Sequence, residues 1–341
     1  MNFASAAGIY LFLTRFTGGA MVSKVPPMLA ARRVAVARPL RVPRRIAFGD
    51  FVVTGGRVSV RQTGNSAALD LRLAREVGGW LVFQAALRVR ALFVRRRAAI
   101  WFAPQVPHDR YLVRAAMRLA GLGVARTREA AAAAFYFEDT TSAPPPVRSH
   151  ARALNFDCND ISKSRVATIF EQVFGYPLAV DPRRWNGVAV EKSEHNGTHD
   201  GRIVDCPRAA LPGKSYSRLI DTVDGDGLAV DLRTHVIGGA PVLVWVKRRP
   251  AAARFLPPND TATLCRPEDV FSADELARLG EFARAMGADW CGLDVLRDRD
   301  GRIYVVDVNK TDAGPVVALS LADKLRSTAL MARALRKLVE A

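Results

Sequence analysis

The sequence predicts a mixed α/β protein, mainly of the α+β class, with a small α/β unit ahead of a larger C-terminal part. Two observations carry this prediction. Residues 98–137 alternate an apolar run, a stretch with helical spacing and a second apolar run, which is typical of a parallel β–α–β unit. From residue 187 onward, strand-like runs follow one another with turns between them and helices on either side. A chain of 341 residues has room for about two domains.

Positive charge is concentrated in the first third of the chain. Residues 1–130 hold 22 Lys and Arg against 5 Asp and Glu, whereas residues 131–341 hold 28 of each kind. A G+C-rich genome accounts for the preference for Arg, at 42 against 8 Lys, but not for its placement. The basic excess is therefore a property of the N-terminal part alone.

The early basic part has no helical pattern. Residues 31–61 carry eight arginines against Asp50 alone, and Pro39 and Pro43 disfavour a helix in its first half. We therefore expect residues 1–97 to be a basic N-terminal extension that is partly flexible.

An apolar run, Phe3–Leu13, opens the chain and is followed by Arg15. It is too short to span a bilayer, and it lacks the basic n-region of a signal peptide. Met21 and Met28 are alternative starting points for translation, so this run is not expected to carry a function.

Residues Leu69–Val94 have helical apolar spacing, interrupted at Gly78-Gly79, and lead into Arg95-Arg96-Arg97. Two roles are open for this helix. Its apolar face packs onto the following domain, which we favour, or its interleaved arginines make it a basic amphipathic helix that contacts an anionic membrane or polyanion. Specific nucleic-acid binding is not expected, because no aromatic-rich strand motif or helix-turn-helix accompanies the charge.

The small α/β unit follows this helix. Ala98–Ala103 reads as a buried strand, Asp109 is a candidate N-cap for a helix through Ala120, and Ala133–Phe137 reads as a second strand. This order predicts a small parallel unit.

Glycines and prolines mark the end of the predicted helix and of the unit. Gly121 and Gly123 follow the helix, and the third glycine of a dinucleotide-binding motif is missing, so no dinucleotide site is expected. The run Pro144-Pro145-Pro146 marks a boundary, which assigns residues 98–154 to the small unit and its linker.

Four cysteines are widely spaced along the chain, and none belongs to a C-x-x-C pair. This spacing predicts neither a zinc site nor a disulfide framework, and it is compatible with a reducing, cytoplasmic compartment. The four are Cys158, Cys206, Cys265 and Cys291.

A lysine leaves a predicted strand directly before a turn that contains Gly, Asn and Thr. The strand Gly187–Lys192 leads into residues 193–201, and a second strand begins at Arg202. A point charge beside free backbone N–H groups suits a triphosphate, although a structural hairpin would look much the same. His195 and His199 lie on the turn rather than on one helix face, so zinc is not expected.

The remaining elements are predicted from apolar runs and capping signals. Ser272 followed by Glu275 is a capping box, which indicates a helix start. Helices are predicted at about Ser162–Phe174 (ended by Gly175), Ser272–Met286 and Ala318–Leu338, and strands at Ser215–Ile220, Val230–Ile237 and Val242–Lys247.

Two apolar runs flank Asp300-Gly301, which predicts a hairpin with a two-residue turn. In that register Asp294 lies directly opposite Asp307, and Asn309 shares the face of Asp307 because side chains alternate along a strand. Facing carboxylates repel one another, and a bound Mg²⁺ would remove that repulsion. The alternative is the polar outer face of an ordinary hairpin.

The order of these parts is more informative than any one of them. A lysine at a helix start, a strand-end lysine with a covering turn, a D-L-R strand, distal arginines and a hairpin ending D-x-N follow one another. In this order, residues 155–320 resemble the ATP-grasp superfamily, most closely its ribosomal-protein glutamate ligase and glutathione synthetase branch. The resemblance implies an ATP-grasp domain at residues 155–341, with two α+β subdomains gripping ATP and Mg²⁺. It also implies that the preceding small unit is the Rossmann-like one that accompanies this fold.

The resemblance also implies roles for individual residues. Two lysines and a turn would contact the phosphates, a backbone segment would meet adenine, two arginines would face the γ-phosphate or the acceptor, and three side chains would hold magnesium. The phosphate-contacting residues would be Lys163, Lys192, Asn196, Gly197 and Thr198, and the adenine segment would be Arg218, Leu219 and Ile220. The two arginines would be Arg233 and Arg254, and the magnesium ligands would be Asp294, Asp307 and Asn309.

The chemistry implied by the resemblance is activation of a carboxylate as an acyl phosphate, which an amine or thiol then attacks. Phosphoryl transfer needs mainly positioning and charge neutralisation, so no nucleophilic side chain is expected. Two alternatives stay open: a kinase of the same superfamily that phosphorylates a hydroxyl, and a non-catalytic adaptor that binds an anionic surface. Small-molecule or peptide substrates are the expected partners, and a homodimer is compatible with the sequence.

Overall fold

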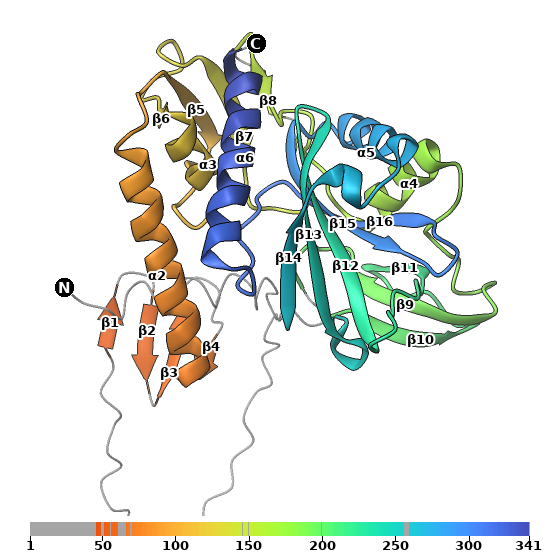
Figure 1. The fold of residues 1–341 in the computed structure, drawn as a ribbon. Coiled ribbons are helices and arrows are strands. Elements are labelled where there is room, and N and C mark those ends of the chain that lie inside the picture. Colours follow the sequence, from red (N-terminus) through yellow and green to blue (C-terminus); the bar gives the residue numbers. More distant parts are fainter. Residues whose placement is uncertain are drawn as a thin grey trace, which may run out of the picture.

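The computed structural model describes residues 46–48, 51–54, 56–60, 66–68, 70–144, 146–148, 150–198, 200–255 and 259–340. The apolar run at Phe3–Leu13, the beginning of the basic arm and His199 lie outside these residues. In the ribbon of Figure 1, the sheet of the small unit lies with its helices on one side and two antiparallel sheets lie on the other, with α6 (Leu321–Glu340) between them.

The small unit is a parallel sheet in the order β6-β5-β7-β8. Its strands are β5 (Ala98–Pro104), β6 (Leu122–Val124), β7 (Ala133–Phe137) and β8 (Ala153–Leu154), and α3 (Leu112–Ala120) links the first two. The predicted β–α–β order is present, with β6 and β8 as additional strands that the sequence pattern did not indicate.

The predicted N-cap of α3 is wrong, whereas its C-terminal glycine is confirmed. Tyr111 is the N-cap residue, and the Asp109 carboxylate instead pairs with the Arg118 side chain on the same helix. Gly121 ends the helix in the left-handed conformation at φ 74°, and Gly123 lies inside β6.

The helix α2 (Leu71–Ala91) belongs to the core of the small unit rather than to a separate extension. It runs unbroken through Gly78-Gly79, contrary to the predicted interruption. Phe83 and Leu87 are almost fully buried in one apolar cluster with α3, β5 and α6. The expected boundary at residue 97 therefore cuts through a packed core, and packing onto the following domain is the role that the structure gives to this face.

Ahead of α2, short strands form an antiparallel sheet in the order β1-β2-β3-β4, in a region where the sequence indicated only a basic arm. The charge and proline pattern concealed these strands, which lie beside the N-terminal part of α2 in Figure 1. They are β1 (Ile46–Phe48), β2 (Phe51–Thr54), β3 (Arg57–Val60) and β4 (Ser66–Ala68).

Two antiparallel sheets make up the larger part of the chain. One has three strands in the order β10-β9-β11, and the other has five in the order β14-β13-β12-β15-β16. The strands are β9 (Gly187–Ser193), β10 (Arg202–Cys206), β11 (Lys214–Arg218), β12 (Leu228–Ile237), β13 (Ala240–Pro250), β14 (Thr261–Cys265), β15 (Trp290–Arg297) and β16 (Ile303–Asn309).

Local signals located the three helices of this part well. Ser162 caps α4 (Lys163–Phe174) and Gly175 ends it, and Ser272 with Glu275 forms the predicted capping box of α5 (Ala273–Ala285). The last helix, α6, spans Leu321–Glu340 and begins three residues later than predicted.

The five-stranded sheet packs on both faces because its side chains alternate along each strand. On β13, Val244 and Val246 pack with α4 and α5, whereas Leu243 and Trp245 pack with α6 and the small unit. One sheet thus joins two apolar cores. The second face, beyond the α6 contact, carries the charged side chains described below.

The hairpin of β15 and β16 differs from its predicted form at the turn. Gly301 has φ 85°, and Asp298 pairs with Arg302 through backbone hydrogen bonding, so the loop contains three residues rather than two. A bulge then shifts the register between Asp294 and Val295. The two deviations cancel, and Asp294 lies opposite Asp307 as predicted.

None of the described helices combines the length and the apolar composition that crossing a bilayer requires.

Candidate functional site

A cavity of about 880 Å³ lies between the three-stranded sheet, the five-stranded sheet and the small unit. Its lining includes residues of β9, β11 and β16, and also Tyr111, Asp139 and residues of the loop after β16. Every residue of the sequence-predicted site contributes to the lining: Lys163, Lys192, Asn196, Gly197, Thr198, Arg218, Leu219, Ile220, Arg233, Arg254, Asp294, Asp307 and Asn309.

A cross-strand row of charged residues forms the floor of this cavity. Arg233 on β12 lies opposite Asp294 on β15, which lies opposite Asp307 on β16. Asn309 is two residues beyond Asp307 on the same strand. The antiparallel register, rather than any local motif, brings these side chains to one face.

Two cations hold the Asp294 carboxylate. Arg233 Nη1 lies 2.8 Å from its Oδ2, and Lys247 Nζ lies 3.1 Å from its Oδ1. Burial opposes the ionisation of Asp294, but the charges of Arg233 and Lys247 outweigh burial and hold its pKa well below the usual range. Asp294 is therefore an anion in this site.

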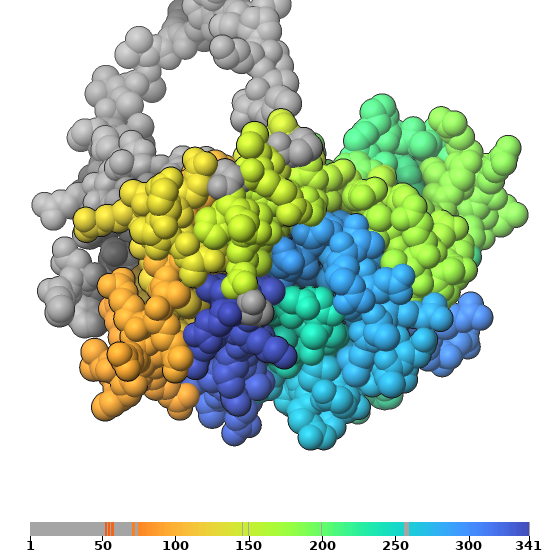
Figure 2. Space-filling view, turned by 90° about the horizontal axis from the view of Figure 1, so that it is seen from above, coloured from red at the N-terminus to blue at the C-terminus, as the bar shows by residue number. Residues whose placement is uncertain are grey.

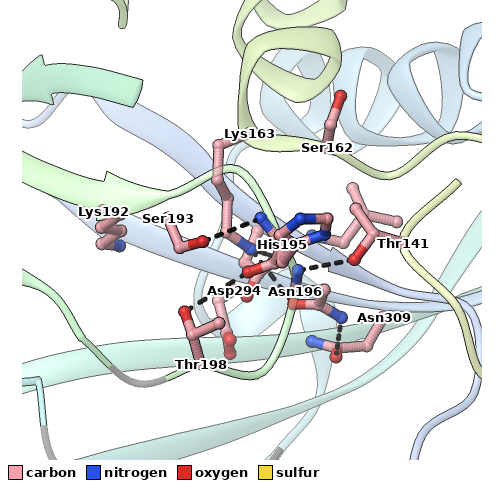
Figure 3. Close-up of polar contacts among 12 residues, drawn as sticks. Thr141, Ser162, Lys163, Lys192, Ser193, His195, Asn196, Thr198, Asp294 and Asn309 are labelled. Atoms are coloured by element: carbon pink, nitrogen blue, oxygen red, sulfur yellow. Dashed lines mark hydrogen bonds and ion pairs between the residues drawn. The ribbon is translucent and has the colours of Figure 1, made fainter. Parts of the chain in front are cut away.

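The Asp307 carboxylate has a different partner. Lys163, the first residue of α4, donates from Nζ to Asp307 Oδ1 at 2.5 Å and to Asn196 Oδ1 at 3.1 Å. Figure 3 shows this lysine reaching from the helix toward the loop that carries Asn196. The predicted repulsion between the facing carboxylates is therefore wrong for this state, because each carboxylate has its own cation.

The turn after β9 approaches the hairpin through Asn196. Its Nδ2 lies 3.2 Å from Asn309 Oδ1, and its backbone N–H donates to the Thr141 hydroxyl at 2.7 Å (Figure 3). In the alternative orientation of the Asn309 amide, its oxygen instead accepts from Arg233 at 2.6 and 2.9 Å, and its nitrogen is then the atom 3.2 Å from Asn196 Nδ2. The turn, the linker residue Thr141 and the Asn309 amide thus lie in one group of polar contacts.

Lys192, at the end of β9, stands apart from these pairs (Figure 3). Within the described part of the chain, its ammonium makes no hydrogen bond or ion pair. Burial lowers its pKa, and the nearby charge of Lys163 lowers it further. An anion placed beside these two lysines would oppose both effects by stabilising the charged ammonium, which makes this position suited to a phosphate.

Gly201, which closes the turn, leaves room for the Phe255 ring. A Cβ on Gly201 would lie 2.9 Å from the Phe255 ring and 3.5 Å from Lys192 Cε. The wall beyond this point is apolar, with Val190, Leu296 and Val306 lining the same cavity. Arg218, Leu219 and Ile220 line the same cavity.

The two predicted arginines are held differently. Arg233 is locked between Asp294 and Asp312, whereas the Arg254 Nε donates to the Ala251 carbonyl at 3.0 Å on the cavity rim. Only Arg233 therefore belongs to the charged floor in this state.

Sequence reasoning missed the residues that surround Arg233. Asp312 accepts from its Nη2, and His235 Nδ1 lies 3.4 Å from the other Asp312 oxygen. Burial raises the pKa of Asp312 even though Arg233 lies against it, and burial also lowers the pKa of His235 well below its usual value. His235 is thus a neutral ring, packed 4.3 Å from Trp245 between ring centroids.

A second missed group extends the floor along β13. Lys247 Nζ also lies 2.8 Å from Asp231 Oδ2, and Arg249 Nη2 lies 3.0 Å from the same oxygen. The strand Val242–Lys247 and the D-L-R strand were both noted in the sequence, but only the pairing of Asp231 with Lys247 across β12 and β13 joins them.

Gly292 permits the close approach of Asp312. A Cβ at this position would lie 1.9 Å from Asp312 Oδ2 and 2.8 Å from Arg233 Nε. We expect Gly292→Ala to displace this pair and to lower the free energy of unfolding by about 1–3 kcal/mol, as overpacking typically does. Denaturant unfolding measures the loss. Gly225→Ala is the control, because nothing lies within 4 Å of a Cβ there, and equal losses in both variants would contradict this role.

The donor set suits magnesium better than zinc. Among the described residues, no three His, Cys, Asp or Glu side chains gather as a metal site. Two carboxylates with an amide oxygen are oxygen ligands, and Mg²⁺ is commonly held by one or two carboxylates together with substrate phosphates. Asp294, Asp307 and Asn309 therefore offer the kind of oxygen ligands that Mg²⁺ takes.

No protein-family model matches the chain. A curated relative, the probable alpha-L-glutamate ligase of Marinomonas sp. (strain MWYL1), is 27% identical over 151 residues, which are 43% of this chain and 46% of that protein. The chain thus spans about half the length of the curated relative it matches. The predicted resemblance to ATP-grasp ligases agrees with this similarity.

The chain is also similar to solved structures of ligases. An ATP-grasp ligase, PsnB, complexed with a precursor variant, Mg and ADP, is 12% identical, with 69% of this chain and 99% of that chain covered and a TM-score of 0.43. The L-amino acid ligase from Bacillus licheniformis is 15% identical over 72% of this chain and 75% of its own, with a TM-score of 0.41. At these scores, the function must be derived from the geometry of this chain.

Proposed function

We propose that the chain is an ATP- and Mg²⁺-dependent ligase that joins a carboxylate to an amine or a thiol, with residues 155–341 as its ATP-grasp domain and residues 98–154 as the accompanying small unit. The observation that carries this proposal is the cavity floor. Asp294, Asp307 and Asn309 share one face of a hairpin, and Lys163, Lys192 and Arg233 surround them. Opposed sets of carboxylates and cations suit a metal–triphosphate complex, in which each set finds a partner of opposite charge.

ATP would bind with its adenine against the apolar wall beside Arg218, Leu219 and Ile220. Lys163 and Lys192 would then contact the α- and β-phosphates, and Asn196, Gly197 and Thr198 would cover them. For this to happen, Lys163 must leave Asp307, so nucleotide binding exchanges one ion pair for another.

Magnesium, held by Asp294, Asp307 and Asn309, would neutralise charge on the phosphates. Arg233 and Arg254 would orient the γ-phosphate or the acceptor. A substrate carboxylate oxygen attacks the γ-phosphorus, the bond to the β-bridging oxygen breaks, and ADP leaves with an acyl phosphate formed. An amine or thiol then attacks the acyl carbon, loses a proton, and expels inorganic phosphate.

A nucleotide-release assay on the purified chain tests this function. Pools of carboxylates and amines are offered with ATP and Mg²⁺, and ADP and phosphate are measured together. We expect both products in equal amounts only when a carboxylate and an amine or thiol are present. ADP without free phosphate would instead indicate a kinase that phosphorylates a hydroxyl, and failure to bind nucleotide would contradict both enzymes.

Binding of ATP should depend on Lys192. The Lys192→Met variant loses a hydrogen bond to a charged group, worth roughly 1.5–3 kcal/mol, so affinity for ATP·Mg²⁺ should fall about tenfold or more. Isothermal titration calorimetry measures the change. Lys337→Met on the exposed face of α6 is the matched control and should bind normally; unchanged affinity in Lys192→Met would reject the assignment of this lysine.

A further inference from the structure

The C-terminal end of α2 exposes a cluster of apolar and basic side chains that the proposed enzyme does not use. Leu92 is 80% exposed and Phe93 is 86% exposed, and Val89, one turn earlier, is 56% exposed. Figure 2 shows this end of α2 as a corner of the molecule beside α6. Large apolar side chains this exposed, adjacent in sequence, commonly mark an interaction site.

Arginines flank this apolar tip on both sides. Arg88, Arg90 and Arg95 are exposed, and none of the three has an acidic partner in the described parts of the chain. Arg97 Nη1 lies 3.7 Å from Glu340 Oε1, and both of these side chains are exposed. Residues 77–108 contain five arginines and no Asp or Glu, so this segment carries positive charges and no negative ones, and the acid recorded beside it is Glu340.

Along α2, the apolar side chains change from buried to exposed toward the C-terminal end. Trp80, Phe83 and Leu87 face the core, and the following turn presents Leu92 and Phe93 outward. Backbone hydrogen bonds from Leu92 to Arg88 and from Val94 to Ala91 hold that turn in place. The tip is therefore a fixed projection of a packed element.

We propose that this tip, formed by Val89, Leu92 and Phe93 with Arg88, Arg90 and Arg95, docks onto the surface of a membrane that contains anionic phospholipids. The apolar side chains enter the boundary between headgroups and acyl chains, and the arginines remain at the headgroup phosphates. A soluble polyanion would engage the arginines but would leave Val89 and Leu92, which have no stacking face, in water. The combination of both kinds of side chain favours a lipid surface.

Vesicle co-sedimentation of the full chain tests this proposal. Vesicles of phosphatidylcholine with about one third phosphatidylglycerol are compared with pure phosphatidylcholine at about 0.1 M salt, where the Debye length is about 10 Å. We expect the unmodified chain to bind the anionic vesicles. We expect the affinity of the Leu92→Ser/Phe93→Ser variant for these vesicles to be lower by about tenfold or more. Arg88→Gln/Arg90→Gln should also lose about tenfold, because each basic residue near the surface contributes.

Matched controls keep the test specific. Val147→Ser removes an equally exposed apolar side chain at 85% exposure, and Arg183→Gln/Arg184→Gln removes two exposed arginines distant in the sequence. Both should bind anionic vesicles as the unmodified chain does, and all variants should keep its melting temperature. No binding to anionic vesicles, equal binding by Leu92→Ser/Phe93→Ser, or binding to RNA that exceeds vesicle binding and ignores the apolar change would overturn the proposal.

Discussion

Asp307→Asn should reduce ATP turnover about a hundredfold or more. Metal neutralisation of the transferring phosphoryl group is worth several kcal/mol, and each 1.4 kcal/mol is a factor of ten. The amide keeps the shape of the side chain but loses the negative charge that would hold Mg²⁺. Steady-state turnover with a responsive substrate pair, in the presence of Mg²⁺, measures the effect.

The same variant should also lose stability without ligand. Asp307 pairs with Lys163 at a site where the two side chains are only 22% and 11% exposed, so removing the charge weakens a largely buried contact by about 1–2 kcal/mol. If Asp294 and Asp307 repelled one another, as the sequence suggested, the same variant would instead gain stability. Asp300→Asn, at the exposed tip of the same hairpin, is the control. Normal turnover by Asp307→Asn, or stabilisation by Mg²⁺·ATP as large as in the unmodified chain, would contradict the metal assignment.

Phe83→Ala should destabilise the whole chain. Phe83 on α2 is 1% exposed in the core that also contains α3, β5 and α6, and truncation of a buried Phe to Ala costs about 3–5 kcal/mol. The loss should appear as a lower denaturant midpoint. A chain that begins near residue 95 should fail for the same reason, because it lacks the helix that covers this core.

Val82→Ala is the matched change on the same helix. Val82 is 54% exposed, so its truncation should cost little. If Phe83→Ala and Val82→Ala had similar denaturant midpoints, α2 would be a peripheral extension, as the charge pattern alone suggested.

Local signals in the sequence were sufficient for α4, α5 and the strand that carries Lys192. Capping residues act over one turn, so Ser162 and Ser272 mark helix starts whatever surrounds them. The pairing of Asp294 with Asp307 was also predicted, but through two deviations that cancel, a longer loop and a bulge. Such compensation depends on packing of the whole sheet and leaves no local pattern.

The contact between Asp312 and Arg233 could not be predicted from local patterns in the sequence. Asp312 meets Arg233 only because Gly292 leaves space on the intervening strand, and the two residues are 79 positions apart. The extent of α2 was obscured by Gly78-Gly79, which elsewhere would weaken a helix, whereas here buried Val77 and Trp80 hold the flanking turns. Tertiary packing outweighed propensity in this case.

We expect ATP to phosphorylate a substrate carboxylate at this site, and the fate of the carboxylate oxygens tests that step. For a substrate pair that releases ADP, the carboxylate is prepared with ¹⁸O in both oxygens, and the released phosphate is analysed by mass spectrometry. Attack of the carboxylate on the γ-phosphorus, followed by displacement at the acyl carbon, predicts one ¹⁸O in each phosphate formed. Phosphate without ¹⁸O, or release of AMP and pyrophosphate, would contradict the acyl phosphate mechanism.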